Sequence, residues 1–337
     1  MSAMSGAVGR LDGYQQRHRW AGLAFAVYKK FGDDQAGNLA ALISYYLFSS
    51  VFPLLLALTT VLGYVLGGHP ALGQRVYDGA LRNLPIVGQY SRLHPLTGNA
   101  FGLVVGLVIG IWSGLAVARQ AQNAFAVVWD VPRVERPGYL PRLLRSAELV
   151  VVVGGGLVLA TLAQGLVSAS QVYGLHLGVG TVVLAAVVGI VIDVAVLAWA
   201  FRRGSGLPLD WRRIMPGAVT GGTGWFLLQK FGSHLVNSRV AGARSASGTF
   251  AVVIGLLFYF FLLAQVTLYS AELNVVLAKS LWPRGLRTLT GVPTTEADQR
   301  AYEAYPQRER QAHHTDVDVE VEVGPESAGP AEPTTER

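Results

Sequence analysis

The pattern of hydrophobic and polar positions is dominated by long stretches without charge. One of them contains forty residues, from Gln35 to Gln74, and holds no Asp, Glu, Lys or Arg. Its centre, residues 39–66, is 28 residues long. A helix that rises about 1.5 Å per residue crosses a hydrocarbon core of about 30 Å within that length. This stretch therefore predicts a transmembrane helix.

Further apolar stretches of helical length follow, and only 14% of the residues are charged, against about 25% in an average globular protein. We therefore expect an all-α integral membrane protein with a six-helix transmembrane domain at residues 37–278. The predicted spans are residues 39–66, 101–118, 149–173, 177–201, 214–231 and 250–277.

The first predicted span carries a polar face. Asn38, Tyr45 and Ser49 follow each other at intervals of seven and four residues, so they lie on one side of a helix. Pro53 has no N–H, which leaves the carbonyl of Ser49 without its helical partner. Since polar groups in hydrocarbon need partners, we expect this face to point into the helix bundle or into a wet cavity. Polar contacts between helices and a binding cavity both remain open interpretations.

The second span contains the most regular motif in the chain. Gly102, Gly106, Gly110 and Gly114 are spaced four residues apart, which produces a smooth strip that another helix backbone can approach closely. Tight packing inside one chain is favoured over dimerisation. Glycine also interrupts the fifth span, where we expect a broken helix next to a cavity.

An amphipathic pattern precedes the first span, within a cytoplasmic N-terminal region at residues 1–36. The apolar positions at helical spacing are Trp20, Leu23, Ala24, Val27, Tyr28 and Phe31. The flanking cations are Arg17, Arg19, Lys29 and Lys30. We expect a helix that lies in the membrane interface, with its aromatic face toward the acyl chains and its cations toward the headgroups.

The net charge of +6 hides an asymmetry along the chain. Residues 1–290 carry a net charge of +13, whereas residues 291–337 contain 4 Lys or Arg and 11 Asp or Glu. The basic charge therefore belongs to the membrane-embedded part and indicates contact with anionic lipid, not nucleic acid. We expect residues 279–337 to form a cytoplasmic tail, largely disordered from residue 294 onward because large apolar residues are few there.

The distribution of basic residues predicts the orientation. With six spans, one side of the membrane receives 21 Lys or Arg and the other side receives 6. The positive-inside rule then places both termini in the cytoplasm.

Two acidic residues, Asp193 and Glu272, lie inside predicted spans. Charge is costly in hydrocarbon, so we expect partners for them near the cytoplasmic ends. Arg119 or Lys279 is expected to pair with Glu272, with Asn274 completing the hydrogen bonds. Ion pairs that close the bundle and a polar cavity that takes a headgroup or a proton are both compatible with these positions.

Catalytic templates are missing from the sequence. The chain has no cysteine, and its seven histidines show no metal-ligand spacing. The sequence also has no Walker A pattern, and no GxGxxG or GxSxG pattern between a predicted strand and a predicted helix. We expect no cofactor, no metal and no enzymatic activity.

Several segments resemble a known family. They are AGNLAALISYYLFSSVFPLLLALTTVLG (36–63), WSGLAVARQAQNAFAVVWDVPR (112–133), MPGAVTGGTGWFLLQKF (215–231) and LYSAELNVVL (268–277). In combination they resemble the YihY/BrkB family of bacterial inner-membrane proteins. The resemblance implies six transmembrane helices in the inner membrane. Two motifs differ from the family pattern, because Ala246-Ser247-Gly248 replaces a Tyr-Gly pair and Ser270 replaces a glycine before Ala-Glu.

Members of this family were once labelled ribonuclease BN, a label for which these residues provide no support, since a nuclease needs carboxylates or histidines that converge on phosphate or metal. The leading hypothesis is transport or lipid handling. In it an amphipathic substrate binds a cavity lined by Asn38, Tyr45, Ser49, Pro53, the fifth span and Glu272. The alternative is a membrane scaffold that binds a second copy or an envelope protein through the glycine face and the acidic tail. The expected partners include membrane lipids and exclude nucleic acid.

Overall fold

A computed structural model describes residues 12–65, 100–172, 179–241, 248–285 and 295–310. All regular elements in these ranges are helical, which confirms the predicted all-α class. The long helices are α3 (Ala36–Val65), α6 (Ala100–Val128), α7 (Tyr139–Val172), α8 (Val179–Gly204), α9 (Trp211–Ala241) and α10 (Gly248–Ala278). Shorter helices are α2 (Arg19–Asp33), η1 (Arg133–Glu135) and α11 (Glu296–Arg308).

Three of the long helices have the length and composition needed to cross a membrane, within the part of the chain that the structure describes. They are Val104–Val128 of α6, Val183–Gly204 of α8 and Val253–Ala278 of α10. A shorter apolar helical segment, Ala36–Val51, begins α3. The chain is therefore a membrane protein, while the number of six crossings remains a prediction.

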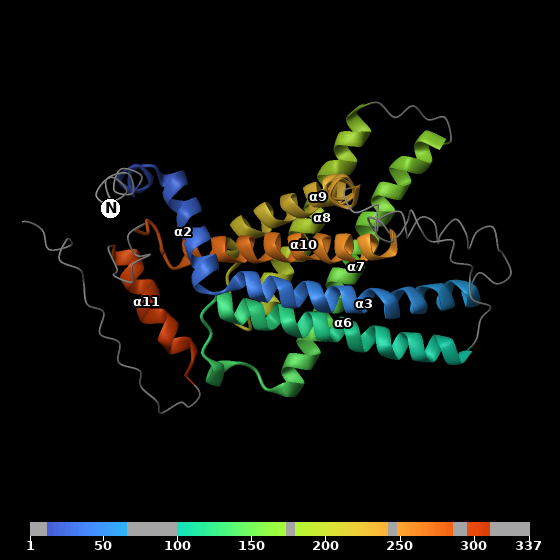
Figure 1. Ribbon diagram of the computed structural model, residues 1–337, viewed down its shortest axis with the longest axis horizontal. Coiled ribbons are helices and arrows are strands. Elements are labelled where there is room, and N and C mark those ends of the chain that lie inside the picture. The colour runs from blue at the N-terminus through green and yellow to red at the C-terminus, as the bar shows by residue number, and fades with distance from the viewer. Residues whose placement is uncertain (1–11, 66–99, 173–178, 242–247, 286–294, 311–337) are drawn as a thin grey trace, which may run out of the picture.

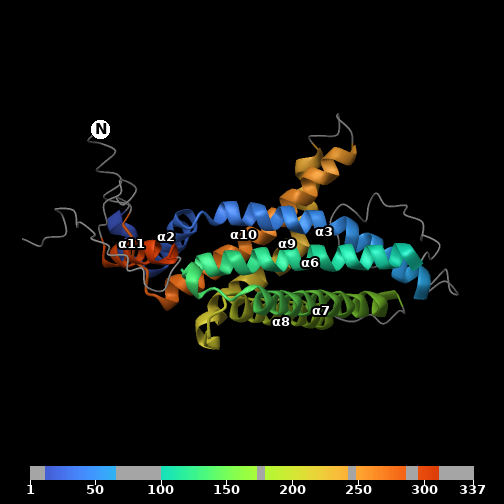
Figure 2. The same ribbon diagram turned by 90° about the horizontal axis from the view of Figure 1, so that it is seen from below.

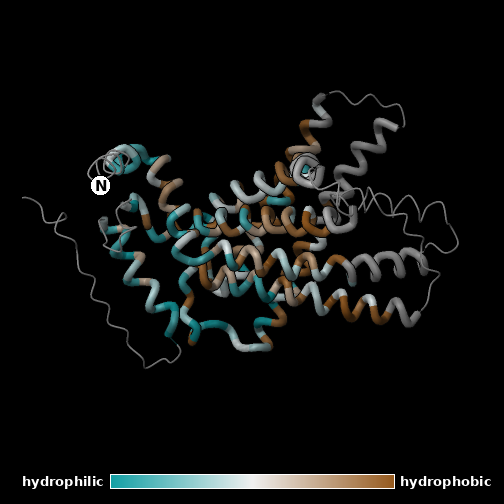
Figure 3. Tube along the Cα trace, in the orientation of Figure 1, coloured by the Kyte–Doolittle hydropathy of each residue, from teal (hydrophilic) through white to brown (hydrophobic). Residues whose placement is uncertain are grey.

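The long helices lie against one another in a bundle. Helix α3 packs against both α6 and α10, and the three run nearly parallel in Figure 1. Helices α7 and α8 lie side by side beneath α3 and α6 when the molecule is turned (Figure 2). Helix α9 packs against α8 and α10. Apolar residues dominate the middle of the bundle, and hydrophilic residues gather at the end that carries α2 and α11 (Figure 3).

Helix α9 corrects the expectation of a broken fifth span, because it continues through Pro216 and its glycines. A side chain at Gly217 would overlap the backbone carbonyl of Ser270 and the amide of Asn274, and one at Gly221 would overlap the Ser270 hydroxyl. These glycines allow the backbones of α9 and α10 to approach closely. They serve close helix packing.

Helix α2 is present where the amphipathic pattern predicts it, and it runs steeply across one end of the bundle in Figure 1. Trp20 is 85% exposed and Tyr28 is 66% exposed. The side chains of Lys29 and Lys30 are buried, so the prediction that they face headgroups is wrong. Its position in a membrane interface remains a prediction.

Helix α11 corrects the prediction of a disordered tail for residues 295–310. Thr295 caps its first turn, because its hydroxyl oxygen accepts a hydrogen bond from the backbone N–H of Asp298 at 3.2 Å. Ala297 and Ala301 are buried. The segment has few large apolar residues, and its ion pairs with Lys29 of α2 and with Asp34, just after α2, help to hold it in place.

Candidate functional site

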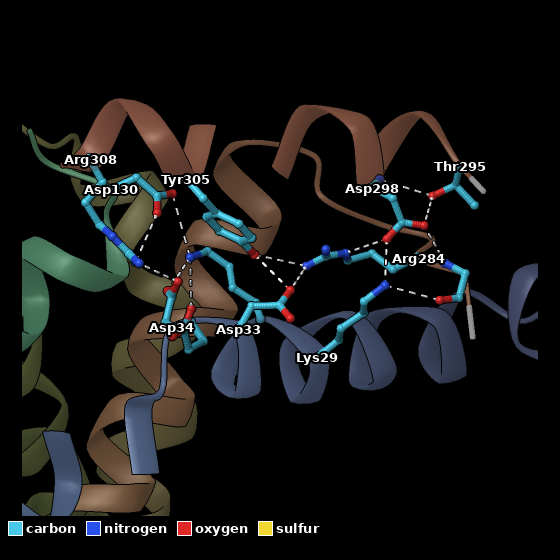
Figure 4. A network of polar contacts seen from close by, with 12 residues as sticks. Lys29, Asp33, Asp34, Asp130, Arg284, Thr295, Asp298, Tyr305 and Arg308 are labelled. Atoms are coloured by element: carbon cyan, nitrogen blue, oxygen red, sulfur yellow. Dashed lines mark hydrogen bonds and ion pairs between the residues drawn. The ribbon is translucent and has the colours of Figure 1, made fainter. Parts of the chain in front are cut away.

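Buried and partly buried charged side chains gather where α2, α3, α6, α10 and α11 meet (Figure 4). We call this group the ion-pair cluster. It has an inner part around Lys30 and an outer part around Asp298. The inner part consists of Lys30, Asp34, Asp130, Glu272, Lys279 and Arg308. The outer part consists of Lys29, Asp33, Arg284, Asp298 and Tyr305.

Lys30 is the centre of the inner part, and its side chain is fully buried. Its Nζ lies 2.5 Å from Oδ2 of Asp34, 3.5 Å from Oε2 of Glu272 and 3.7 Å from Oδ2 of Asp130. Burial by itself lowers the pKa of Lys30, but the three carboxylates outweigh burial and raise the pKa above its ordinary value. The three acids around Lys30 therefore favour its cationic form.

Two further cations balance the acids. Arg308 of α11 places Nη1 2.9 Å from Oδ1 of Asp34, and Lys279 places Nζ 2.9 Å from Oδ2 of Asp130. Burial raises the pKa of Asp34, an effect that Lys30 and Arg308 oppose. The inner part thus contains three cations and three carboxylates, so it is neutral when every group is ionised.

Sharp turns at the ends of three helices bring these side chains together. Gln35, Asp130 and Ser280 have positive φ angles of 51°, 54° and 53°, a left-handed conformation that is uncommon for residues other than glycine. Each turn contains a member of the cluster or follows one, since Asp34 precedes Gln35 and Lys279 precedes Ser280. The chain direction changes at each of these points, where its charged residues meet.

Glu272 of α10 is completely buried, and its only charged partner in the described residues is Lys30 at 3.5 Å. Its carboxyl group also lies beside that of Asp34, close enough for a hydrogen bond between the two when one of them is protonated. The expected partners are wrong. Arg119 instead donates from Nε to the carbonyl of Leu115 at 3.3 Å, and Lys279 pairs with Asp130. Lys30 takes the place of both, because α2 folds back over the end of α10.

Asp298 organises the outer part of the cluster. Its carboxylate lies 2.9 Å from Lys29 Nζ and 2.9 Å from Arg284 Nε, and it accepts a hydrogen bond from the backbone N–H of Gly285 at 2.9 Å. Burial pushes the pKa of Asp298 upward, but these donors outweigh burial and hold it below its ordinary value. Asp298 is therefore an ionised buried acid.

Tyr305 and Arg284 both contact Asp33 within the outer part of the cluster. The Tyr305 hydroxyl donates to Oδ2 of Asp33 at 2.9 Å, and Arg284 Nη1 lies 2.9 Å from the same oxygen. Burial raises the pKa of the Tyr305 phenol. Since Lys30 also lies 5.8 Å from the centre of the Tyr305 ring, this one side chain of α11 contacts both parts of the cluster.

The predicted polar face of the first span lies on the surface of α3. Asn38 and Ser49 are exposed and Tyr45 is 60% exposed, whereas Pro53 is half-buried. The expectation that this face points into the bundle is therefore wrong. We call Asn38, Tyr45 and Ser49 the α3 strip. The side chains of α3 that do face inward include Ser44 and Ser50, whose hydroxyls donate to carbonyls of their own helix at 2.8 and 2.7 Å.

The other predicted intramembrane residues lie in separate places. Asp193 of α8 accepts a hydrogen bond from Gln229 of α9 at 3.3 Å. Asn274 of α10 accepts one from the backbone N–H of Gly217 at 2.6 Å. The structure therefore does not bring the α3 strip, Asp193 and Glu272 into a single cavity.

The glycine face of α6 is partly described. Gly106 and Gly110 are buried within the chain, and a side chain at Gly114 would contact Val150 of α7 at 3.7 Å. The surroundings of Gly102 lie outside the described residues. The buried positions agree with packing inside one chain.

Sequence reasoning missed most members of the ion-pair cluster. A signal for α11 was present, because Thr295 and Asp298 have the spacing of a helix-capping pair. Lys30, Asp34 and Asp130 lie at helix ends, where a charged residue is equally compatible with exposure to solvent or headgroups. In the described part of the chain, no group of His, Cys, Asp and Glu side chains is arranged to hold a metal ion.

Comparisons with known proteins agree on one family. The family model described as Virulence factor BrkB matches residues 27–286. The chain is also 23% identical over 265 residues to the inner membrane protein YhjD of Escherichia coli strain K12, which covers 72% of this chain and 77% of that protein. No solved structure matches the chain significantly.

Proposed function

The chain belongs to the BrkB family, and from the geometry described above we propose that it moves an amphipathic molecule of the lipid class within the membrane. In this proposal the polar head of the substrate slides along the α3 strip while its apolar part stays among the lipid acyl chains. The strip is thus an open track on the surface of a helix and not an enclosed cavity.

The observation that carries the proposal is the exposure of the α3 strip. Tyr45 is 60% exposed and Leu42, on the same side of α3, is 47% exposed, so one helix face offers both polar and apolar contacts. Asn38 and Ser49 lie eleven residues apart, about 16 Å along a helix. Polar side chains that face hydrocarbon need hydrogen-bonding partners, and a lipid headgroup provides them.

The ion-pair cluster adjoins the start of α3, at one end of the α3 strip. Asp34 lies two residues before the start of α3, and Lys30 contacts both Asp34 and Glu272 of α10. Ionisable residues inside a membrane protein are costly and are typical of pathways for substrates, ions or protons. In the proposal, the closed cluster holds the end of α2 and the start of α3 against the end of α10, and its opening separates them.

The location forms part of the same proposal. We place the chain in the bacterial inner membrane with six crossings and both termini in the cytoplasm. The relative from Escherichia coli is named an inner membrane protein, and the 21 to 6 division of basic residues supports the orientation. The ion-pair cluster then lies at the cytoplasmic side.

Reconstituted vesicles provide the test. The purified protein is placed in phospholipid vesicles that contain a trace of lipid with a fluorescent headgroup, and a reductant added outside bleaches only the outer leaflet. The wild-type protein is expected to carry inner-leaflet lipid outward and so make it accessible to the reductant. Replacing Tyr45→Leu and Ser49→Leu together is expected to slow this step about tenfold or more, since two hydrogen bonds contribute about 1 kcal/mol each.

A matched control uses the same chemical changes elsewhere. Tyr139 at the start of α7 is 70% exposed, and Ser113 lies on α6 with its hydroxyl bonded to its own helix. The pair Tyr139→Leu and Ser113→Leu should leave the rate unchanged. Equal rates for the two pairs, or a wild-type rate no higher than that of empty vesicles, would overturn the proposal.

A further inference from the structure

Asp193 is a buried acid that lies outside the ion-pair cluster. It belongs to the apolar segment Val183–Gly204 of α8 and is 6% exposed. Eleven residues separate it from the end of α8 at Gly204, which is about 16 Å at helical rise. The proposed function assigns it no role.

The helices around Asp193 offer it polar groups but no paired cation. Gln229 of α9 donates from Nε2 to Oδ2 of Asp193 at 3.3 Å. Tyr259 of α10 is buried, and its phenol lies within reach of the charge on Asp193. Lys230, the next residue of α9, is exposed and lies over the ring of Phe226 at 5.6 Å.

Helix α7 also packs against α8, and its sequence has no Asp, Glu, Lys, Arg or His from Leu149 to Val172. On α9, the side chain of His234 lies outside the described residues. Among the side chains that the structure describes, no Lys, Arg or His forms an ion pair with Asp193. Glu272 differs, because Lys30 lies 3.5 Å from it.

An ionised carboxylate without a cation is unfavourable at this depth in a membrane protein. A neutral carboxylic acid suits the surroundings, because Oδ2 accepts the hydrogen bond from Gln229 and the O–H on the other oxygen is a donor. We propose that Asp193 is a proton-binding site inside the membrane. One proton passes from a hydronium ion to the carboxylate, which leaves water and a neutral acid, and the reverse step restores the carboxylate.

Infrared spectroscopy of the full chain tests this directly. The protein is labelled with carbon-13 in its aspartate carboxyl groups and placed in lipid nanodiscs, and the carbonyl band of a protonated carboxylic acid is followed as pH rises. The difference between wild type and Asp193→Asn isolates the band of Asp193 from those of other acids. We expect this band in mildly acidic solution and its loss as the pH rises.

Two further variants keep the proposal falsifiable. Asp210→Asn changes an exposed acid in the loop before α9 and should leave the band in place. Gln229→Met removes the donor that favours the ionised form, so the loss of the band should move to higher pH. The proposal is overturned if no band in mildly acidic solution is lost with Asp193→Asn, if the band does not respond to pH, or if Gln229→Met leaves the titration unchanged. The measurement involves no lipid movement, so its result is independent of the transport assay.

Discussion

Replacing Lys30→Met is the most severe test of the ion-pair cluster. The inner part contains three cations and three carboxylates, and Lys30 is its central and fully buried cation. Without it, Asp34 and Asp130 keep Arg308 and Lys279 as partners, but Glu272 loses its ion pair. Removing one partner of a buried ion pair costs about 3–5 kcal/mol. We expect a loss of unfolding free energy of that size.

The assay is equilibrium unfolding of the purified protein in mild detergent, with a second substitution that restores neutrality. Glu272→Gln removes the carboxylate that Lys30→Met leaves without a cation. The double variant should therefore be more stable than the sum of the two single losses predicts, with a coupling energy of about 1–3 kcal/mol. Lys230→Met, at an exposed lysine of α9, is the matched control and should stay within about 0.5 kcal/mol of wild type.

Two results would refute the reasoning. If Lys30→Met destabilises the protein no more than Lys230→Met, the buried ion pairs of Lys30 do not contribute to the unfolding free energy. If the losses of Lys30→Met and Glu272→Gln simply add, the two side chains do not interact across the 3.5 Å that separates them in the structure.

Two further predictions concern helix packing and the attachment of α11. Gly217→Val forces a side chain against the backbone of Ser270 and should lower the unfolding free energy by about 1–3 kcal/mol or more. Gly154→Ala is the control, because nothing lies within 4 Å of an added Cβ there, and it should leave stability unchanged or raise it. Equal effects of the two variants on thermal unfolding would contradict the close approach of α9 and α10. The stability that ionised Asp298 contributes is fully present above the unfolded pKa of about 3.9 and is lost as pH falls through its lower folded pKa. Digestion by pepsin should therefore leave α11 intact in mildly acidic solution and cleave it only in stronger acid. In Asp298→Asn, pepsin should cleave α11 at every pH tested. Cleavage of the wild-type protein that begins well above the ordinary aspartate pKa would contradict the predicted pH dependence.

The positions of the long helices could be predicted closely because membrane helices follow from local composition. The sixth predicted span, 250–277, corresponds to α10 at Gly248–Ala278, and the second forms the first part of α6. The fifth was harder to predict because its glycines are compatible with either a break or a close contact. The position of α10 against them decides between the two.

The charged residues could not be assigned to partners from the sequence. Lys30 and Glu272 are separated by more than two hundred residues, and Lys29 and Asp298 by 269. A lysine at the end of an amphipathic helix has the same local pattern whether it faces headgroups or is buried against acids. The sequence also predicted the polar face of α3 but not whether that face points into or out of the bundle. The helix period defines which residues share a face and does not say what covers that face.

The sequence by itself determined that this is an all-α membrane protein with long apolar helices, because uncharged stretches of that length are stable only in hydrocarbon or in a helix core. It also identified the family. The tertiary structure alone decided that α11 is ordered, that Lys30 is the partner of Glu272 and that the α3 strip lies outside. These features depend on charges and surfaces that meet only after folding, and Coulomb attraction depends on distance in space and not along the chain.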